Sequence, residues 1–196
     1  MSEKWAKKPK TKKAKEQVPP EVKARREAYD WIQSLVSALL ICVLVFVFVF
    51  RIMDVNGSSM VPTLSNGDKL LVSDLFYEPE RGDIVVFKKD SYDPNKALVK
   101  RVIAVAGDVV NIDFDNGIVY VNGEAVQEDY IKVSTNTKLD FIGPQTVPEN
   151  CLFVMGDNRN GSTDSRDKRI GMVDKRLVVG KVLLVVYPFN SFGMVE

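Results

Sequence analysis

An uninterrupted apolar run lies in the first third of the chain. Residues 31–50 carry no charged side chain, and Val, Leu and Phe fill most positions from Leu35 to Phe50. About 20 such residues in an α-helix cross a hydrocarbon core of about 30 Å. A cleaved signal peptide would have a shorter apolar core and a small-x-small cleavage site after it, whereas Arg51 follows this run directly. We therefore predict one N-terminal transmembrane helix over residues 31–50.

From residue 51 onward, the apolar positions come in short runs separated by Gly, Asn, Asp and Pro, which is typical of β-strands and turns. The predicted strands cover residues 69–73, 83–87, 97–106, 109–113, 118–121, 151–155 and 177–187. Asn-Gly pairs at 66–67, 116–117 and 122–123 suit hairpin turns that need a positive φ. The pattern predicts a mainly β domain over residues 51–196, in which about 109–149 form an inserted hairpin and loop region.

Charge is distributed unevenly along the chain. Residues 1–30 hold ten Lys or Arg and five Asp or Glu, whereas residues 51–196 hold 17 and 21. Because basic flanks stay in the cytoplasm, we expect residues 1–30 to be a cytoplasmic tail and residues 51–196 to lie outside the cytoplasmic membrane. The first 20 residues are predicted to be disordered, and they either contact anionic lipid or act only as a topology signal. The net charge of +1 gives no reason to expect a nucleic-acid partner.

The residue types that are missing restrict the chemistry. The chain has no histidine, which excludes Ser-His-Asp and Cys-His catalysis and His-ligated zinc. Its two cysteines, Cys42 and Cys151, are too few for a Cys-rich metal site, and Cys42 lies within the apolar run. We expect no structural disulfide, no metal and no cofactor. Any nucleophile in this protein needs a base other than imidazole.

A serine-rich segment follows the predicted span. Asn56–Leu64 (NGSSMVPTL) contains Gly57, which permits unusual backbone angles, and Pro62, which restricts a turn. Such a segment suits the display of one serine side chain. The same residue types also dominate ordinary loops, so both interpretations stay open for the segment taken alone.

Lys100 lies in an apolar predicted strand. Alternation places Leu98, Lys100, Val102 and Ala104 on one face and Val99, Arg101, Ile103 and Val105 on the other. The neighbouring cations Lys100 and Arg101 therefore point in opposite directions. Either Lys100 reaches water at a sheet edge, or it is desolvated, and its neutral amine then accepts a proton from a serine hydroxyl.

A polar loop, Gly156–Arg166 (GDNRNGSTDSR), follows the predicted strand 151–155. Asp157, Asn158 and Asp164 are residue types that bind calcium, but the EF-hand spacing is absent and Arg159 would oppose a bound cation. Pairing between arginines and carboxylates within the loop explains its composition better.

Four segments together carry a resemblance to a known family. Residues 59–64 (SMVPTL), 81–87 (RGDIVVF), 98–108 (LVKRVIAVAGD) and 156–166 resemble, in order, the motifs of bacterial type I signal peptidases. These are membrane-bound Ser-Lys endopeptidases that remove signal peptides from secreted proteins. The single span and small insertion look more like the short Gram-positive type. The resemblance implies a signal-peptidase-like β-sheet catalytic domain.

Roles follow from this resemblance residue by residue. Ser59 matches the nucleophile, and Lys100 matches the general base that also activates the deacylating water. Ser162 matches the serine that orients the lysine amine, and Asp164 matches an acidic residue that supports the site. The remaining polar matches would be structural and would tie the loop 156–166 to the strand of Lys100; they are Arg101, Asp157, Arg159 and Arg166.

The resemblance also implies how substrate binds. Signal-peptide-bearing preproteins would bind as an extended strand and be cut after small-x-small sequences. The backbone N–H of Ser59 is the implied oxyanion donor, and at Gly57, where some relatives have a side-chain donor, the backbone or water would have to serve. The candidates to line the substrate pocket, each of which fits ordinary core packing equally well, are Met53, Val55, Met60 and Val99. Phe189 and Phe192 are candidates to contact membrane lipid.

Two other functions stay open at the level of sequence. One is another Ser-Lys protease on the same scaffold, such as a self-cleaving cytosolic repressor domain, which would have no reason to carry a membrane span. The other is a non-enzymatic, membrane-tethered β-rich binding domain, in which Ser59 is a turn residue and Lys100 has an ordinary pKa. For the signal peptidase, we expect a monomer.

Overall fold

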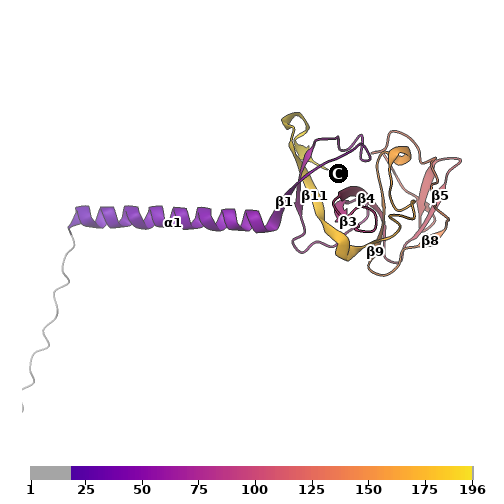
Figure 1. The fold of residues 1–196 in the computed structure, drawn as a ribbon. Helices are drawn as coiled ribbons and strands as arrows, with labels where there is room; N and C mark the ends of the chain where they lie inside the picture. Colours follow the sequence, from indigo (N-terminus) through magenta and orange to yellow (C-terminus); the bar gives the residue numbers. More distant parts are fainter. Residues whose placement is uncertain (1–18, 196) are drawn as a thin grey trace, which may run out of the picture. The chain divides into compact units, whose positions relative to one another are not determined.

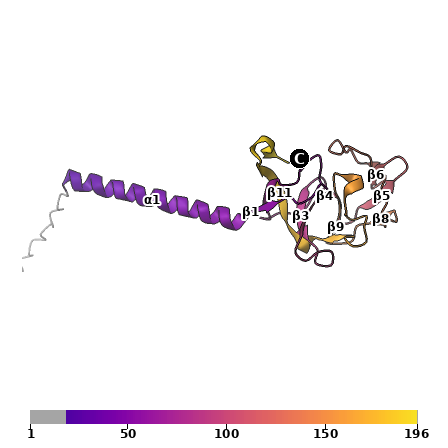
Figure 2. The same ribbon diagram turned by 45° about the horizontal axis from the view of Figure 1, so that its top comes forward.

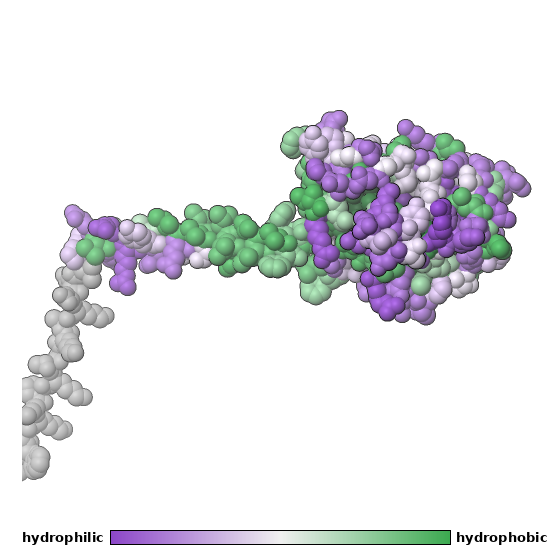
Figure 3. Space-filling model, in the orientation of Figure 1, coloured by the Kyte–Doolittle hydropathy of each residue, from purple (hydrophilic) through white to green (hydrophobic). Residues whose placement is uncertain are grey.

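The computed structural model describes residues 19–195, and the chain divides into two compact units, residues 1–45 and 46–196. The helix α1, Pro20–Val49, has 30 residues, none of them buried. Figure 3 shows apolar side chains along its second half and polar ones near its start. The helix is long and apolar enough to cross a membrane. The predicted span falls within α1 except for Phe50, and residues 1–18 of the predicted tail lie outside the described residues.

The second unit is built from short strands and single turns of 3₁₀-helix. The strands are β1 (Phe50–Asp54), β2 (Lys69–Ser73), β3 (Ile84–Lys88), β4 (Ala97–Val105), β5 (Val109–Asp113), β6 (Ile118–Val121), β7 (Glu124–Ala125), β8 (Gln145–Thr146), β9 (Cys151–Met155), β10 (Val173–Asp174), β11 (Val178–Tyr187) and β12 (Gly193–Met194). The 3₁₀-helices are η1 (Arg159–Gly161), η2 (Lys175–Leu177) and η3 (Phe189–Ser191).

These strands form two antiparallel sheets. The larger has the order β1-β2-β11-β3-β4-β9-β10, with β12 beside β11, and the smaller has the order β7-β6-β5-β8. Figures 1 and 2 show β3, β4 and β9 in the middle of this unit and the smaller sheet at one side of it. The strand β4 pairs with β3 over its first half and with β9 from Arg101 onward. It is therefore an interior strand of the larger sheet, between β3 and β9.

The smaller sheet is an excursion of the chain between β4 and β9. Its β6–β7 hairpin turns at Asn122 and Gly123, which both have positive φ (55° and 84°), as a tight primed turn requires. Phe141, which follows it along the chain, packs edge-on against Phe153 of β9, with ring centroids 5.8 Å apart. The two sheets thus share a hydrophobic cluster, which fixes the excursion against the larger sheet.

The mainly β prediction with one N-terminal apolar helix is confirmed, and every predicted strand is present within one residue at each end. The prediction missed β1 and the two-residue strands. Strict alternation along β4 is wrong beyond Val102, because a β-bulge shifts the register between Val102 and Ala104. As a result Ile103 and Ala104 share one cluster, while Val102 and Val105 pack in another.

Candidate active site

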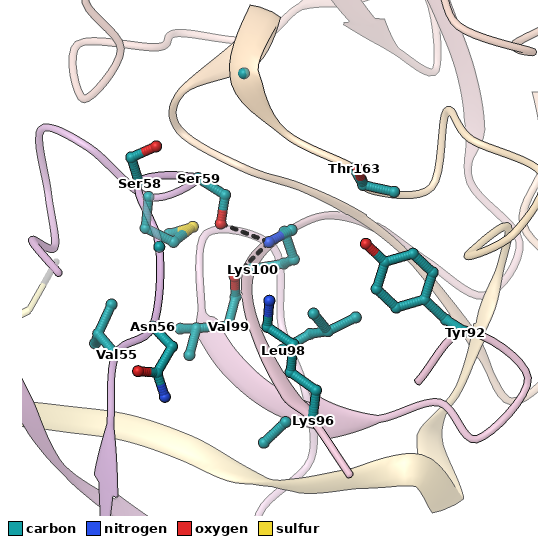
Figure 4. A pocket seen from close by; sticks show the side chains of 14 residues that line it. Val55, Asn56, Ser58, Ser59, Tyr92, Lys96, Leu98, Val99, Lys100 and Thr163 are labelled. Carbon is teal, nitrogen blue, oxygen red and sulfur yellow. Dashed lines mark hydrogen bonds between the residues drawn. The ribbon is translucent and has the colours of Figure 1, made fainter. Parts of the chain in front are cut away.

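Ser59 and Lys100 meet although 41 positions separate them along the chain. The Lys100 Nζ donates a hydrogen bond of 2.7 Å to the Ser59 Oγ, and a second of 2.9 Å to the carbonyl oxygen of Val99 (Figure 4). Ser59 lies in the loop between β1 and β2, and Lys100 lies in the first half of β4. The two predicted members of the pair are therefore within hydrogen-bond reach, as nucleophile and base must be.

Lys100 is almost fully buried, with an exposed fraction of 2%. Burial is the main cause that lowers the pKa of its ammonium group from 10.5 to about 8. The negative charges of Asp164 and Asp157 act in the opposite direction, and the positive charge of Lys96 acts in the same direction as burial. About half of the Lys100 side chains are consequently neutral near pH 8, and the neutral amine is the form that can accept a proton.

The loop that carries Ser59 is held by the polar loop 156–166. The backbone N–H of Asn158 donates to the carbonyl oxygen of Ser59 (3.0 Å), and its side-chain amide donates to that of Ser58 (3.1 Å). The Thr63 hydroxyl donates to Asp157 (2.5 Å). Sequence reasoning assigned no role to Asn158 or Thr63 at the site, because their partners lie about 94 or more positions away.

Arg101 and Asp157 connect β4 to the same loop. The guanidinium donates two hydrogen bonds, of 3.0 and 2.8 Å, to the two carboxylate oxygens, and both side chains are buried. Arg101 also stacks on the ring of Tyr130 at 3.9 Å and donates to the carbonyl oxygen of Gly82. Its side chain is directed away from the Ser59 hydroxyl, as alternation predicted for two neighbouring residues of a strand.

Arg159 and Arg166 were predicted to contact β4, but they have other partners. Arg159 pairs with Glu128 at 2.6 Å and donates to the Thr135 hydroxyl, both in the excursion. Arg166 pairs with Asp164 inside its own loop and donates to the carbonyl oxygen of Thr137. The expectation that they tie this loop to β4 is wrong for both, because buried arginines take the nearest acceptors and the excursion covers this side of the loop.

Ser162 and Asp164, which were predicted to support Ser59 and Lys100, differ from expectation in their hydrogen bonding. The Ser162 Oγ is buried and has no hydrogen-bond partner among the residues described, so the predicted hydrogen bond to Lys100 is not formed. Asp164 accepts hydrogen bonds from Arg166 and from the backbone N–H of Gly156. A Cβ on Gly156 would lie 2.3 Å from the Ser162 Oγ and 2.4 Å from the Ser59 carbonyl oxygen. The loops at the site therefore approach each other as closely as a glycine permits.

The backbone N–H groups of Gly57 and Ser59, the two predicted oxyanion donors, differ in whether they already have an acceptor. The N–H of Gly57 donates to the Asn66 side chain at 2.8 Å, so the expectation that Gly57 supplies an oxyanion donor is corrected. Gly57 instead has φ of +107°, which favours glycine and turns the chain before Ser59. The N–H of Ser59 donates to no acceptor within residues 19–195.

An open cavity of about 200 Å³ adjoins the pair. Val55, Met60 and Val99 line it, and Val55 and Met60 also pack in the core of the larger sheet, so for them both interpretations hold. Met53 packs against that core and is not among the lining residues, which corrects its assignment. Residues that sequence reasoning did not assign to the cavity also line it: Asn56, Ser58, Tyr92, Lys96, Ala97, Leu98, Gly161 and Thr163. Of these residues, only Leu98 could have been predicted from the sequence, because strand alternation places it on the same face of the strand as Lys100.

The acidic residues of the loop 156–166 are engaged with arginines. Asp157 is paired with Arg101 and Asp164 with Arg166, so neither carboxylate is oriented for a cation. Within residues 19–195 no group of three or more His, Cys, Asp or Glu side chains is placed to hold a metal ion. The arrangement supports proton transfer between a serine and a lysine.

Comparisons with known proteins identify the family of this chain. Residues 28–187 match the family model described as signal peptidase, peptidase S26. A signal peptidase I of Bacillus licheniformis is 37% identical over an alignment of 178 positions, which covers 85% of this chain and 92% of that protein. The signal peptidase I S of Bacillus subtilis is 35% identical over an alignment of 181 positions, which covers 87% of this chain and 95% of that protein. The crystal structure of a signal peptidase I from Enterococcus faecalis V583 has 32% sequence identity and a TM-score of 0.43, covering 54% of this chain and 97% of that one. The chain belongs to the signal peptidase (peptidase S26) family of serine endopeptidases.

Proposed function

We propose that this protein is a type I signal peptidase that uses Ser59 as nucleophile and Lys100 as general base to remove signal peptides from secreted preproteins. The observation that carries the proposal is the 2.7 Å contact between the Ser59 Oγ and the Nζ of the buried Lys100. A lysine acts as a base only when its ammonium pKa is brought near the working pH, and burial does this here.

The reaction follows from these positions. Neutral Lys100 takes the proton of the Ser59 hydroxyl, and the Ser59 Oγ attacks the scissile carbonyl carbon to give a tetrahedral oxyanion. The backbone N–H of Ser59 is the donor available to that oxyanion. As the intermediate collapses, the ammonium of Lys100 returns its proton to the leaving amine and an acyl-enzyme remains. Lys100 then removes a proton from water, which attacks the ester and releases the signal peptide.

The first half of β4 suits an extended substrate. The segment Ala97–Lys100 pairs with β3 on one side, whereas β9 pairs with β4 only from Arg101 onward. The same segment lines the cavity next to Ser59. A substrate strand placed there gains main-chain hydrogen bonds, and the apolar part of the small cavity, formed by Val55, Met60 and Val99, favours small apolar side chains. We infer cleavage after small-x-small sequences.

The proposal places residues 51–196 at the outer face of the cytoplasmic membrane. The excess of basic residues before the span supports this orientation, because such flanks stay in the cytoplasm. Ser59 follows Phe50 by nine residues, which suits a substrate that is itself held in the membrane. Phe189 and Phe192 are 83% and 63% exposed, and we infer that they contact lipid.

The test is cleavage of a purified secretory preprotein by the full-length protein in detergent micelles, with the cut site determined by mass spectrometry. We expect cleavage after a small-x-small sequence, and loss of at least 10³-fold in rate in Ser59→Ala and in Lys100→Ala. Ser134→Ala and Lys138→Ala, which change exposed residues of the excursion, serve as matched controls. Cleavage that survives Lys100→Ala would refute the proposed base, and no cleavage of several preproteins in lipid would refute the activity.

A further inference from the structure

A second lysine shares the cavity with Lys100. Lys96 precedes β4 at the end of the β3–β4 loop and lines the same cavity as Ser59 and Lys100. It lies two residues before Leu98 and four before Lys100 along the chain, and all three residues line this cavity. Figure 4 shows the Lys96 side chain running past Leu98 with its amine directed toward Lys100.

Lys96 carries an uncompensated charge. It forms no ion pair with a carboxylate within residues 19–195, and it is an exposed residue. The other cation near the pair, Arg101, is neutralised by Asp157. Among the described residues that line this cavity, Lys96 and Lys100 are the two cations, and neither forms an ion pair.

The other groups that face Lys100 act differently. The Ser59 hydroxyl and the Val99 carbonyl oxygen accept its hydrogen bonds. From the loop 156–166, the negative charges of Asp164 and Asp157 favour the protonated amine, although each is paired with an arginine. From the β3–β4 loop, the Tyr92 side chain lines the cavity and its hydroxyl is directed into it. The two carboxylates therefore raise the pKa of the Lys100 amine, whereas the charge of Lys96 lowers it.

We propose that Lys96 is a positioning residue for the reaction, whose ammonium charge holds Lys100 in the neutral form that accepts the proton of Ser59. A lysine base beside a second cation is a known physical route to an active neutral amine, because two adjacent positive charges repel. This inference rests on the proposed function, since it gives Lys96 a role only if Lys100 is the base.

The size of the expected shift is taken from the general strength of screened interactions between like charges. Desolvation is the larger cause of the lowered pKa of Lys100, and the repulsion by Lys96 adds to it. Because Lys96 is exposed, water and salt screen its charge, and we expect a contribution of about half a pH unit at low ionic strength. Removing the charge of Lys96 should shift the acid limb of the pH–rate profile to higher pH by that amount.

The test is the pH profile of kcat/KM for preprotein cleavage by the full-length protein at low salt. We expect Lys96→Met to shift the acid limb by about half a unit to higher pH, with a similar rate on the alkaline plateau. Lys96→Arg keeps the charge and should keep the wild-type profile. Lys138→Met removes an exposed charge from the excursion and should leave the profile unchanged. Raising the salt concentration should move the wild-type limb toward that of Lys96→Met and barely move the variant.

A second readout does not depend on activity. Competitive acetylation of Lys100, followed by mass spectrometry in the Ser59→Ala protein, measures the titration of this amine directly. The Lys96→Met substitution should shift it upward by the same half unit. An unchanged acid limb and unchanged acetylation profile in an active enzyme would overturn the role of Lys96 and leave the Ser59–Lys100 proposal intact. A higher KM without a shift would also overturn it, because it would indicate a substrate contact. If Lys100→Ala stays active, it is the proposed function that fails.

Discussion

Replacing Lys100 with methionine should stabilise the folded domain near neutral pH while it removes the proposed base. Burial lowers the pKa of this ammonium group from 10.5 to about 8. At 1.36 kcal/mol per pKa unit, keeping the amine protonated in the fold costs about 3 kcal/mol. Methionine has a similar length and no charge to desolvate, but it loses the hydrogen bond to the Val99 carbonyl oxygen, worth about 1 kcal/mol. We expect a net gain of about 2 kcal/mol at pH 7.

The sign of the pH dependence is determined by which state binds more protons. Below pH 8 both the folded and the unfolded chain hold the proton on Lys100, and the full cost is present. Between pH 8 and 10.5 the unfolded chain holds more protons than the folded one, so the stability of the lysine protein rises with pH. Above pH 10.5 the amine is neutral in both states and the cost is gone. The advantage of methionine should therefore disappear over this window.

The assay is pulse proteolysis in urea of full-length Ser59→Ala and Ser59→Ala/Lys100→Met proteins in detergent micelles, from pH 7 to 10. The shared Ser59→Ala change removes cleavage activity and the Ser59–Lys100 hydrogen bond from both proteins. Ser59→Ala/Lys138→Met controls for loss of an exposed lysine and should differ from Ser59→Ala by less than about 0.5 kcal/mol. A stability difference between the first two proteins that does not change with pH would refute the desolvation argument.

Two further outcomes concern the buried polar groups of the site. Arg101→Met should destabilise the domain by about 3–5 kcal/mol in the same assay, because it leaves Asp157 buried without its bidentate partner, and Arg101→Met/Asp157→Leu should recover most of that loss. Ser165→Ala should cost about 1–2 kcal/mol, because the backbone N–H of Val154 loses its acceptor, whereas Ser162→Ala should cost nothing measurable, since its hydroxyl has no partner; equal costs for the two serines would contradict this hydrogen-bond assignment.

Sequence reasoning succeeded where the cause of a structure is local. The apolar length of 31–50, the period-two strands and the Asn-Gly turn at 122–123 each depend on neighbouring residues, and each has the expected form. The strand β1 was missed because its side chains show no alternation that separates it from the end of the span. The two-residue strands were missed because they arise from pairing with a partner, which no short pattern records.

At the candidate site, too, the residues recognised from local motifs were predicted, whereas contacts between distant segments were not. Ser59, Lys100 and the loop 156–166 were identified from motifs, and the absence of histidine restricted the base to lysine. Motifs do not report which acceptors a buried arginine will contact. The pairing of Arg159 with the Glu128 carboxylate and the hydrogen bond from Arg166 to the Thr137 carbonyl oxygen were therefore not predicted.

By itself, the sequence determined the helix that can cross a membrane, the β character of residues 51–196 and the residue types available for chemistry, since these follow from composition and from spacing along the chain. Only the tertiary structure decided that the Ser59 hydroxyl lies 2.7 Å from the Lys100 amine, that Gly57 has given its N–H to Asn66, and that Lys96 points into the same cavity. The physical reason is that hydrogen bonds and electrostatic fields depend on distances in space and on burial, and both arise only when segments far apart in the chain pack together.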